Sequence, residues 1–189
     1  MKTHSSLLPA LGKLRHDQRG VSAIEFALIA PLMALFYMGT VELASTLLVD
    51  RKITAATTTI GDLVARENTM SNCAIDEIFD AAVLIFEPYD GSAARIRVSS
   101  IAPNAGAPTQ MDVQWGYANA NWTERAAGTT VTLPNGVMAA NGSVIMAEIE
   151  YTYSPPFNSV FQTDPTLVDV FYMRPRGVNQ LPLTTQTCP

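Results

Sequence analysis

Hydrophobic and polar positions divide the chain into an apolar N-terminal stretch and a longer, mixed remainder. Residues 21–49 contain only two charged side chains, Glu25 and Glu42. This length suffices for a helix that crosses a bilayer, which needs about 20 apolar residues. Pro31 is tolerated inside such a helix as a slight kink. The pattern therefore predicts a membrane-spanning helix over residues 21–50.

The helical pattern continues beyond this apolar stretch. Apolar residues recur there at helical spacing, at Ile53, Ala56, Ile60, Leu63 and Val64. After a turn at 68–72, a second helix is predicted over about 74–87, and Pro88 would end it. Asp76 and Glu77 are expected in its first turn, where acids suit the helix dipole. Its predicted apolar face consists of Ile75, Ile78, Phe79, Ala82, Leu84 and Phe86.

From residue 94 onward the hydrophobic period changes to two, which indicates strands. Strands are predicted over residues 94–101, 111–117, 129–136, 144–153 and 167–175, followed by a polar tail. In the fourth of them, Glu148 and Glu150 are expected to face away from the apolar side chains. We therefore expect an α+β fold: a long N-terminal transmembrane helix, a second helix, and an antiparallel sheet packed on the exposed half of the first helix.

The residues before the apolar stretch form a short basic leader. It carries Lys2, Lys13, Arg15 and Arg19 against a single acid, Asp17. Basic residues directly before an apolar helix stay on the cytoplasmic side, so the body after the helix would be exported. The predicted organisation is a leader at 1–20, a transmembrane helix at 21–50 and an exported α+β domain at 51–189.

A secretory signal peptide is the alternative interpretation of the N-terminus. Its apolar region is usually 7–15 residues long, shorter than the stretch in this chain. Ala44, Ser45 and Thr46 form the best small-residue cleavage site, and that site is weak. The length of the apolar stretch favours an anchor.

Composition and charge narrow the classes of function. Only 15% of the residues are charged, against about a quarter in soluble proteins. After Gly20 the chain carries eight basic and sixteen acidic residues, and this acidic body argues against nucleic-acid binding. Both histidines, His4 and His16, lie in the leader. A chain without it would lack serine–histidine and cysteine–histidine catalysis, and we expect no enzyme, metal site or cofactor.

The two cysteines, Cys73 and Cys188, lie far apart and form no CxxC motif. This spacing is unlike that of zinc or redox sites. In an exported domain a disulfide between them would persist, and its 115-residue loop would contribute roughly 4–5 kcal/mol in the chain-entropy model. Two unpaired thiols are the alternative.

Glu25 is the most informative single residue. A carboxylate inside a membrane helix costs about 2.5–3.5 kcal/mol on insertion scales. The alternative is that Glu25 lies at headgroup depth near the start of the helix, where its carboxylate would cost little free energy. If the chain is instead cut after Gly20, Val21 gains a free amine one helical turn from Glu25 and on the same face. The amine and the carboxylate could then neutralise each other, within a subunit or between neighbours, because an unpaired charge in an apolar bundle is costly.

A resemblance to a known family rests on these same residues. The stretch GVSAIEFALIAPLMALFYMGTVEL resembles the TadE-like pseudopilins of Tad/Flp pilus systems. The runs EIEYTYSPPF and VDVFYMRPR are similar to the C-terminal part of those proteins. The similarity is strong over 19–50 and looser over 144–176. The fold of residues 70–143 is inferred from pattern alone.

The resemblance implies a minor pilin-like subunit that is cut by a prepilin peptidase between Gly20 and Val21. Glu25 and Phe26 would belong to the assembly motif of a Tad/Flp-type adhesive pilus. The implied partners are the prepilin peptidase, other pilins and pseudopilins, the inner-membrane assembly platform and membrane lipid. The implied location is the bacterial inner membrane, with a cytoplasmic N-terminus and a periplasmic domain that stays at the pilus base or enters the filament. A sibling pseudopilin of the same systems fits as well.

Two other classes of function are open. The first is an uncleaved single-pass anchor that displays an exported binding domain. The second is an exported enzyme tethered by its helix, which would need a nucleophile motif that the sequence does not show.

The remaining candidate residues receive structural interpretations. Glu42, about 25 Å beyond Glu25 along a helix, is expected to be a solvated acid at the outer membrane interface. Arg95 and Arg97 could pair with the two strand acids as surface ion pairs, which often contribute under about 1 kcal/mol. Three aromatic side chains are expected to form either an exposed contact surface or part of the core: Trp115, Tyr117 and Trp122.

Overall fold

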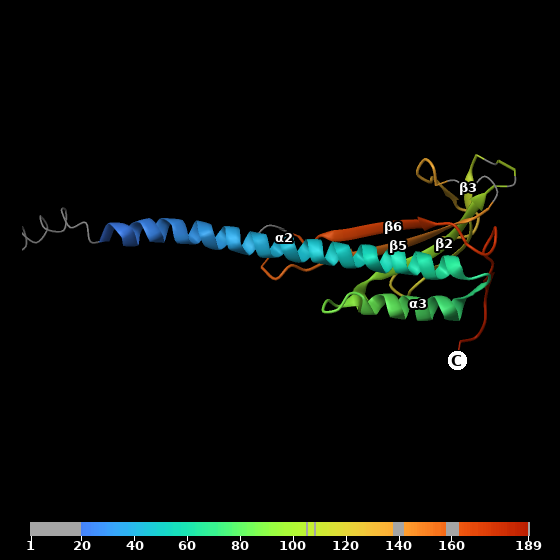
Figure 1. Ribbon diagram of the computed structural model, residues 1–189, viewed down its shortest axis with the longest axis horizontal. Coiled ribbons are helices and arrows are strands. Elements are labelled where there is room, and N and C mark those ends of the chain that lie inside the picture. The colour runs from blue at the N-terminus through green and yellow to red at the C-terminus, as the bar shows by residue number, and fades with distance from the viewer. Residues whose placement is uncertain (1–19, 105, 108, 138–141, 158–162, 189) are drawn as a thin grey trace, which may run out of the picture.

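Two helices and an antiparallel sheet make up the part of the chain that the structure describes. The computed structural model describes residues 20–104, 106–107, 109–137, 142–157 and 163–188, so the predicted leader lies outside this part except for Gly20. Both helices pack on one face of the sheet, and the N-terminal half of the first helix projects beyond the folded domain (Figure 1). The predicted α+β fold is confirmed.

The first helix, α2 (Val21–Arg66), runs without a break for 46 residues, which is about 69 Å. Its projecting half is apolar and long enough to cross a membrane. Its second half supplies a stripe of buried side chains to the core, among them Val49, Ile53, Ala56, Ile60 and Val64. The prediction that the helix extends beyond the apolar stretch is confirmed.

The second helix, α3 (Asn72–Leu84), begins two residues earlier than expected because Ser71 caps it, with its side-chain oxygen accepting a hydrogen bond from the backbone N–H of Ala74. The expected first-turn position of Asp76 and Glu77 is therefore wrong. The predicted apolar face also needs a correction, because Leu84 is 67% exposed. It lies two residues after the buried Ala82, which turns its side chain about 200° around the helix.

Five strands form the main sheet in the order β4-β3-β2-β5-β6, and every neighbouring pair is antiparallel. The strands are β2 (Arg95–Pro103), β3 (Met111–Ala118), β4 (Thr130–Val131), β5 (Val144–Thr152) and β6 (Thr166–Met173). All five predicted strands are found, although β4 is only two residues long. A short 3-10 helix, η2 (Gly91–Ala93), leads into β2.

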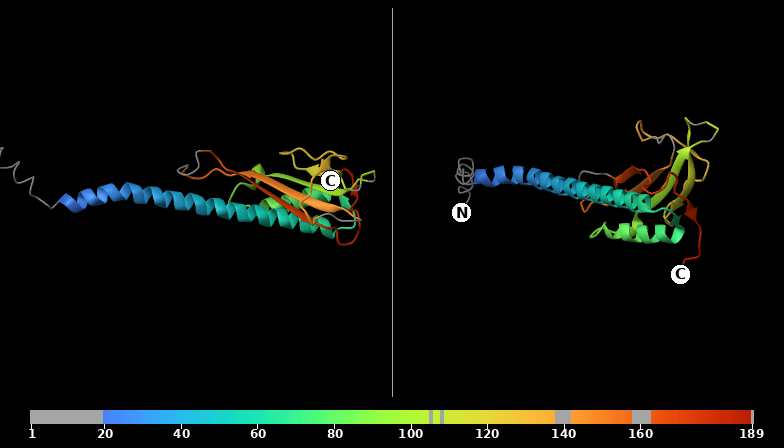
Figure 2. Two further views of the ribbon diagram at one scale, coloured as in Figure 1. Left: turned by 90° about the horizontal axis from the view of Figure 1, so that it is seen from above. Right: turned by 45° about the vertical axis from the view of Figure 1, so that its right-hand side comes forward.

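The main core lies between the helices and the sheet, which curves over α2 (Figure 2). β2 and β5 lie at the centre of the sheet and contribute their alternate apolar residues: Ile96, Val98, Ala147, Ile149 and Tyr151. The same face of the sheet contacts α2 through β5 and β6. The helix half outside the membrane segment is therefore part of the domain and not a linker to it.

The C-terminal tail is ordered around the far end of the helices. β1 (Met70–Ser71) pairs in parallel with β7 (Leu183–Thr184). Leu181, just before β7, is buried in the main core. The tail therefore closes the domain at the end away from the projecting helix, although its sequence is mostly polar.

Candidate functional site

Gly20 stands at the boundary between the predicted leader and α2. It occupies the N-cap position with φ −97° and ψ −7°, a conformation open to any residue. A Cβ built on Gly20 would have no heavy atom within 4 Å. The folded chain therefore sets no steric requirement for glycine at this position.

Glu25 lies one turn into α2, on the same face as Val21 and exposed together with its neighbours. Among the described residues, no side chain forms an ion pair or a hydrogen bond with Glu25. Phe26 beside it is 72% exposed. The structure thus presents both residues of the predicted assembly motif on a bare helix, where another molecule can contact them.

The first half of α2 contains a candidate membrane span. Its most apolar 18-residue window has no buried residue, unlike the core helix of a soluble protein. Large apolar side chains point outward all along it, including Ile24, Leu28, Leu32, Leu35 and Phe36. Since such a surface is stable only in lipid or against other apolar helices, it fits a membrane location.

Glu42 differs from its predicted state. It was expected to be a solvated acid, but it is fully buried. Its backbone carbonyl also accepts a hydrogen bond from Thr46, one turn further along α2. A lone helix cannot cover a glutamate completely, so other parts of the folded chain must surround it. Sequence periodicity could have suggested this, because Glu42, Thr46, Val49 and Ile53 lie along one stripe of the helix.

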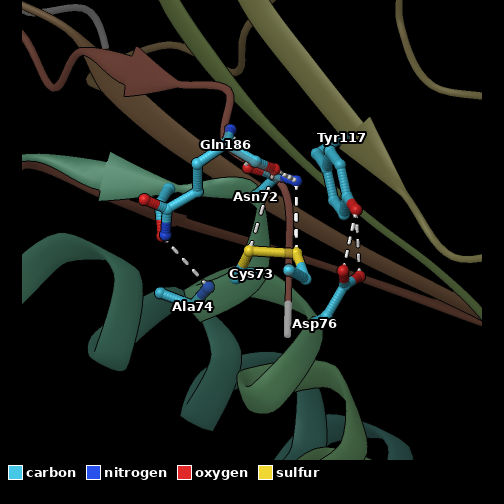
Figure 3. Close-up of a disulfide and its surroundings, with 8 residues drawn as sticks. Asn72, Cys73, Ala74, Asp76, Tyr117 and Gln186 are labelled. Atoms are coloured by element: carbon cyan, nitrogen blue, oxygen red, sulfur yellow. Dashed lines mark hydrogen bonds between the residues drawn. A yellow bond between two sulfur atoms is a disulfide. The ribbon is translucent and has the colours of Figure 1, made fainter.

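Cys73 and Cys188 form a disulfide, as predicted, and the alternative of two unpaired thiols is wrong for this structure. The bond joins the first turn of α3 to the end of the C-terminal tail (Figure 3). Two hydrogen bonds support the same connection: the side-chain amide of Asn72 donates to the carbonyl of Gln186, and the N–H of Gln186 donates to Asn72 Oδ1.

Tyr117 contacts α3 beside this disulfide (Figure 3). Its hydroxyl lies 3.0 Å from both carboxylate oxygens of Asp76. Burial raises the pKa of Tyr117 above its ordinary value, and the hydrogen bond to Asp76 raises it further. Tyr117 is thus a neutral donor that fixes α3 to the sheet, and Asp76 has a structural partner.

The outer face of the sheet holds a buried ion cluster. Glu148 on β5 accepts two hydrogen bonds from Arg97 on β2, at 2.7 and 2.8 Å, and two from Arg125, at 2.9 and 2.8 Å. The expectation that Arg95 and Arg97 could pair with the two strand acids is confirmed, and the strand register sets Arg97 opposite Glu148 and Arg95 opposite Glu150.

The expectation that both were surface pairs is wrong for Glu148, which is only 5% exposed. Arg125 was missed because it lies in an irregular segment without periodicity.

The electrostatic balance around Glu148 favours its charged form. Burial alone would raise its pKa, but the hydrogen bonds and charges of Arg125 and Arg97 outweigh burial and hold the pKa below the ordinary value. The Arg97 guanidinium also lies over the ring of Trp122, 3.8 Å from its centroid. The cluster therefore holds the segment around Trp122 and Arg125 against the sheet.

The three aromatic residues of interest have roles within the fold. Trp115 is half-buried and donates a hydrogen bond of 2.6 Å to the carbonyl of Leu181 in the tail. Tyr117 contacts α3, and Trp122 covers the arginines of β2. Of the two interpretations left open, packing within the domain describes them better than a free contact surface.

An open cleft of about 510 Å³ lies at the end of the domain away from the projecting helix. Its lining holds one acid, Asp112, whose carboxylate accepts hydrogen bonds from Asn104 and Thr130. In the described residues, no three histidine, cysteine or acidic side chains are grouped to hold a metal ion. The cleft thus offers an acid held by its neighbours, not a nucleophile beside a base.

Comparison with protein families identifies the N-terminal segment. Residues 20–61 match the family described as TadE-like protein. Searches of curated proteins and of solved structures gave no match. The matched segment begins at Gly20 and covers the projecting half of α2 together with most of its buried half. The resemblance seen in the sequence is confirmed over residues 20–61, which are similar to TadE-like proteins.

Proposed function

We propose that this protein is a minor pseudopilin that a prepilin peptidase cuts after Gly20 and that takes part in assembling a Tad/Flp-type adhesive pilus. The proposal includes no enzymatic activity. It places the N-terminus of α2 on the cytoplasmic side of the bacterial inner membrane and the folded domain in the periplasm. The observation that carries it is the TadE-like match, which begins at Gly20.

The geometry of the N-terminal segment supports cleavage at this bond. Neither packing nor backbone conformation requires glycine at position 20. Recognition by another protein, such as the peptidase, would explain why glycine is found there. Cleavage would also remove the basic residues of the leader and leave the amine of Val21 one turn from Glu25. A new positive charge and an exposed carboxylate would then share one helix face.

The projecting half of α2 supports a role in assembly. It exposes apolar side chains around its whole circumference, so it can pack against the equivalent helices of neighbouring subunits as well as against lipid. In such a bundle Glu25 would need a positive partner, because a buried unpaired carboxylate is strongly unfavourable. The Val21 amine of the same or of a neighbouring subunit supplies that charge, and the pairing would set the register between helices.

Co-expression with a prepilin peptidase tests the proposal. Intact mass and N-terminal sequencing should show loss of the first 20 residues and a new N-terminus at Val21. The matched variants are Gly20→Leu, which should block the cut, and Ala27→Leu, which enlarges an exposed residue of the same helix and should not. Full-length protein after co-expression with an active peptidase contradicts the proposal and favours the uncleaved anchor.

The anchor and the tethered enzyme differ from a pseudopilin in further measurable ways. An uncleaved anchor would support pilus formation equally well with Gly20→Leu. A tethered enzyme would show turnover in the purified protein, lost when residues lining a cleft are changed. A pseudopilin shows neither behaviour, and its Gly20→Leu variant should reduce the number of pili per cell.

A further inference from the structure

The end of the folded domain that faces the projecting half of α2 exposes apolar side chains from three separate elements. We call this end the membrane-proximal rim and define it by Leu47 and Leu48 on α2, Leu84 at the end of α3, and Phe157 in the connection from β5 to β6. Leu84 is 67% and Phe157 50% exposed. Figure 1 shows the end of α3 and the described residues that follow β5 on the side of the domain nearest the projecting helix.

Contacts hold these elements at one level. The ammonium of Lys52 on α2 donates a hydrogen bond of 3.1 Å to the carbonyl of Ile85, the residue after Leu84. This contact places the end of α3 about one helical turn beyond Leu48 along α2. The pairing of Arg95 with Glu150 brings the end of β5 to the same end of the domain as the start of β2. The connection that carries Phe157 leaves β5 from that end.

Exposed large apolar side chains are otherwise rare on the described surface of the folded domain. Beyond α2, the others are Val168 and Val170, both on β6. The rim therefore combines Leu84, the most exposed large apolar side chain of the described domain beyond α2, and Phe157 with the leucines of α2 at the level where the helix leaves the domain. Exposed apolar side chains that cluster in this way are typical of a surface that contacts a membrane or another protein.

We infer that the membrane-proximal rim rests in the headgroup layer of the bilayer, with Leu84 and Phe157 inserted beside α2. From Val21 to Leu47 the helix is about 39 Å long, close to the full thickness of a bilayer with its headgroups, about 40–45 Å. A helix that starts at the inner interface thus brings Leu47, Leu48 and the rest of the rim to the outer interface. The inference rests on insertion of α2 and not on cleavage.

The burial of Glu42 agrees with this depth. Glu42 lies about 31 Å from Val21 along the helix, at the outer edge of the hydrocarbon core. A carboxylate there would face acyl chains if the folded domain stood away from the membrane, yet Glu42 is completely covered. A domain seated on the bilayer explains why the chain covers a charged group at this level of the helix.

The charges near the rim indicate which lipid surface it fits. Lys52 on α2 donates a hydrogen bond to the carbonyl of Ile85, and two acids, Glu87 and Asp90, follow Ile85 within five residues of the chain, so the segments near the rim carry both signs of charge. Attachment through a polybasic patch to anionic lipid is therefore not expected. The expected surface is a zwitterionic bilayer, entered by apolar side chains.

Site-directed spin labelling of the full chain tests the rim. Cys73 and Cys188 are joined, so an introduced cysteine is the only free thiol to label. Leu84→Cys and Phe157→Cys are labelled with a nitroxide in phosphatidylcholine vesicles. Glu77→Cys is the matched control: Glu77 is exposed on the same face of α3, seven residues earlier and about 10 Å further from the membrane. Leu35→Cys in α2 reports whether the helix is inserted.

Labels at 84 and 157 should collide several-fold more often with oxygen, and several-fold less often with a water-soluble nickel complex, than the label at 77. Equal water exposure at 84, 157 and 77, with a lipid-exposed label at 35, overturns the rim but leaves the proposed function intact. Water exposure at 35 overturns the rim together with the membrane anchor. Protection at 84 and 157 that requires added pilus subunits also overturns it, in favour of a protein contact. Retention of the disulfide, read from mass, verifies the fold of each variant.

Discussion

Gly61 of α2 lies directly against the ring of Phe171 on β6. A Cβ built on Gly61 would be 2.6 Å from Cδ1 of Phe171, which is closer than real contacts allow. The absence of a side chain at this position lets the helix approach the edge strand of the sheet. Gly61 is also the last residue of the TadE-like segment, so that segment ends where the helix meets the sheet.

Adding a side chain at Gly61 should therefore separate helix and strand. Gly61→Val should lower the free energy of unfolding by about 1–3 kcal/mol, the usual cost of overpacking. Gly61→Ala should change it less, because alanine favours a helix over glycine by about 1 kcal/mol. Denaturant titration of the full chain in micelles, followed by tryptophan fluorescence, measures both. In a Phe171→Leu background Gly61→Ala should stabilise; a penalty that persists there contradicts the contact.

The buried cluster on the outer sheet face should be sensitive to loss of its acid. Glu148→Gln leaves Arg97 and Arg125 without a charged partner, and breaking a buried pair costs about 3–5 kcal/mol. Glu150→Gln is the matched control on the same strand, because its pair with Arg95 is more exposed than the Glu148 cluster and should contribute under about 1 kcal/mol. Equal losses in the two variants would contradict the difference in burial.

The same cluster predicts a dependence of stability on pH. The pKa of Glu148 in the folded state lies below its unfolded value, so its contribution is complete above the ordinary glutamate pKa of about 4.3. It is lost as the pH falls through the folded-state pKa. Unfolding midpoints measured from pH 7 down to pH 2 should drop more steeply in the natural chain than in Glu148→Gln. Parallel curves would mean that other groups cause the acid sensitivity.

The disulfide should hold the C-terminal tail in place. Replacing Cys73 and Cys188 by serine opens a 115-residue loop and should lower the free energy of unfolding by roughly 4–5 kcal/mol in the chain-entropy model. It should also release β7, which limited proteolysis followed by mass analysis would detect as early cleavage after about residue 176. The natural chain under reductant is the control and should behave like the variant. If the tail resists proteolysis equally in the variant, the disulfide stabilises the protein only by constraining its unfolded state.

Glu25 should matter for assembly and not for insertion. Glu25→Val removes a charge from a bare, apolar helix surface, so the membrane-bound fraction should stay the same or rise. Pilus number per cell should fall, because the Val21 amine loses its partner. Glu25→Gln keeps the size and shape of the side chain and removes only its charge, so it separates the effect of charge from that of size. Normal pili with both variants would reduce Glu25 to an interfacial acid.

Much of the fold follows from periodicity in the sequence. The placement of Arg97 and Glu148 on one face of the sheet was predictable because alternation fixes which side chains share a face. The extension of α2 to Arg66 was predictable because Ile53, Ala56 and Ile60 keep the helical period. The disulfide followed from two cysteines in a domain expected to be exported.

Contacts between distant segments carry little signal in a single sequence. Arg125 reaches Glu148 from a segment without regular structure, so its role depends on the path of the chain. Burial of Glu42 was missed because its charge suggested solvent, whereas its place on the stripe with Val49 indicated the core. Leu181 and β7 were missed because a polar tail gives no sign of what it packs against.

The uninterrupted course of α2 has a mechanical consequence. One rigid rod passes from the bare segment at Val21 into the core of the domain at Ile60, with no flexible joint between them in the described chain. Any axial force applied at the N-terminal end therefore reaches the sheet directly, through the side chains packed on the last third of the helix. The domain and its anchor must move, tilt and turn as one body.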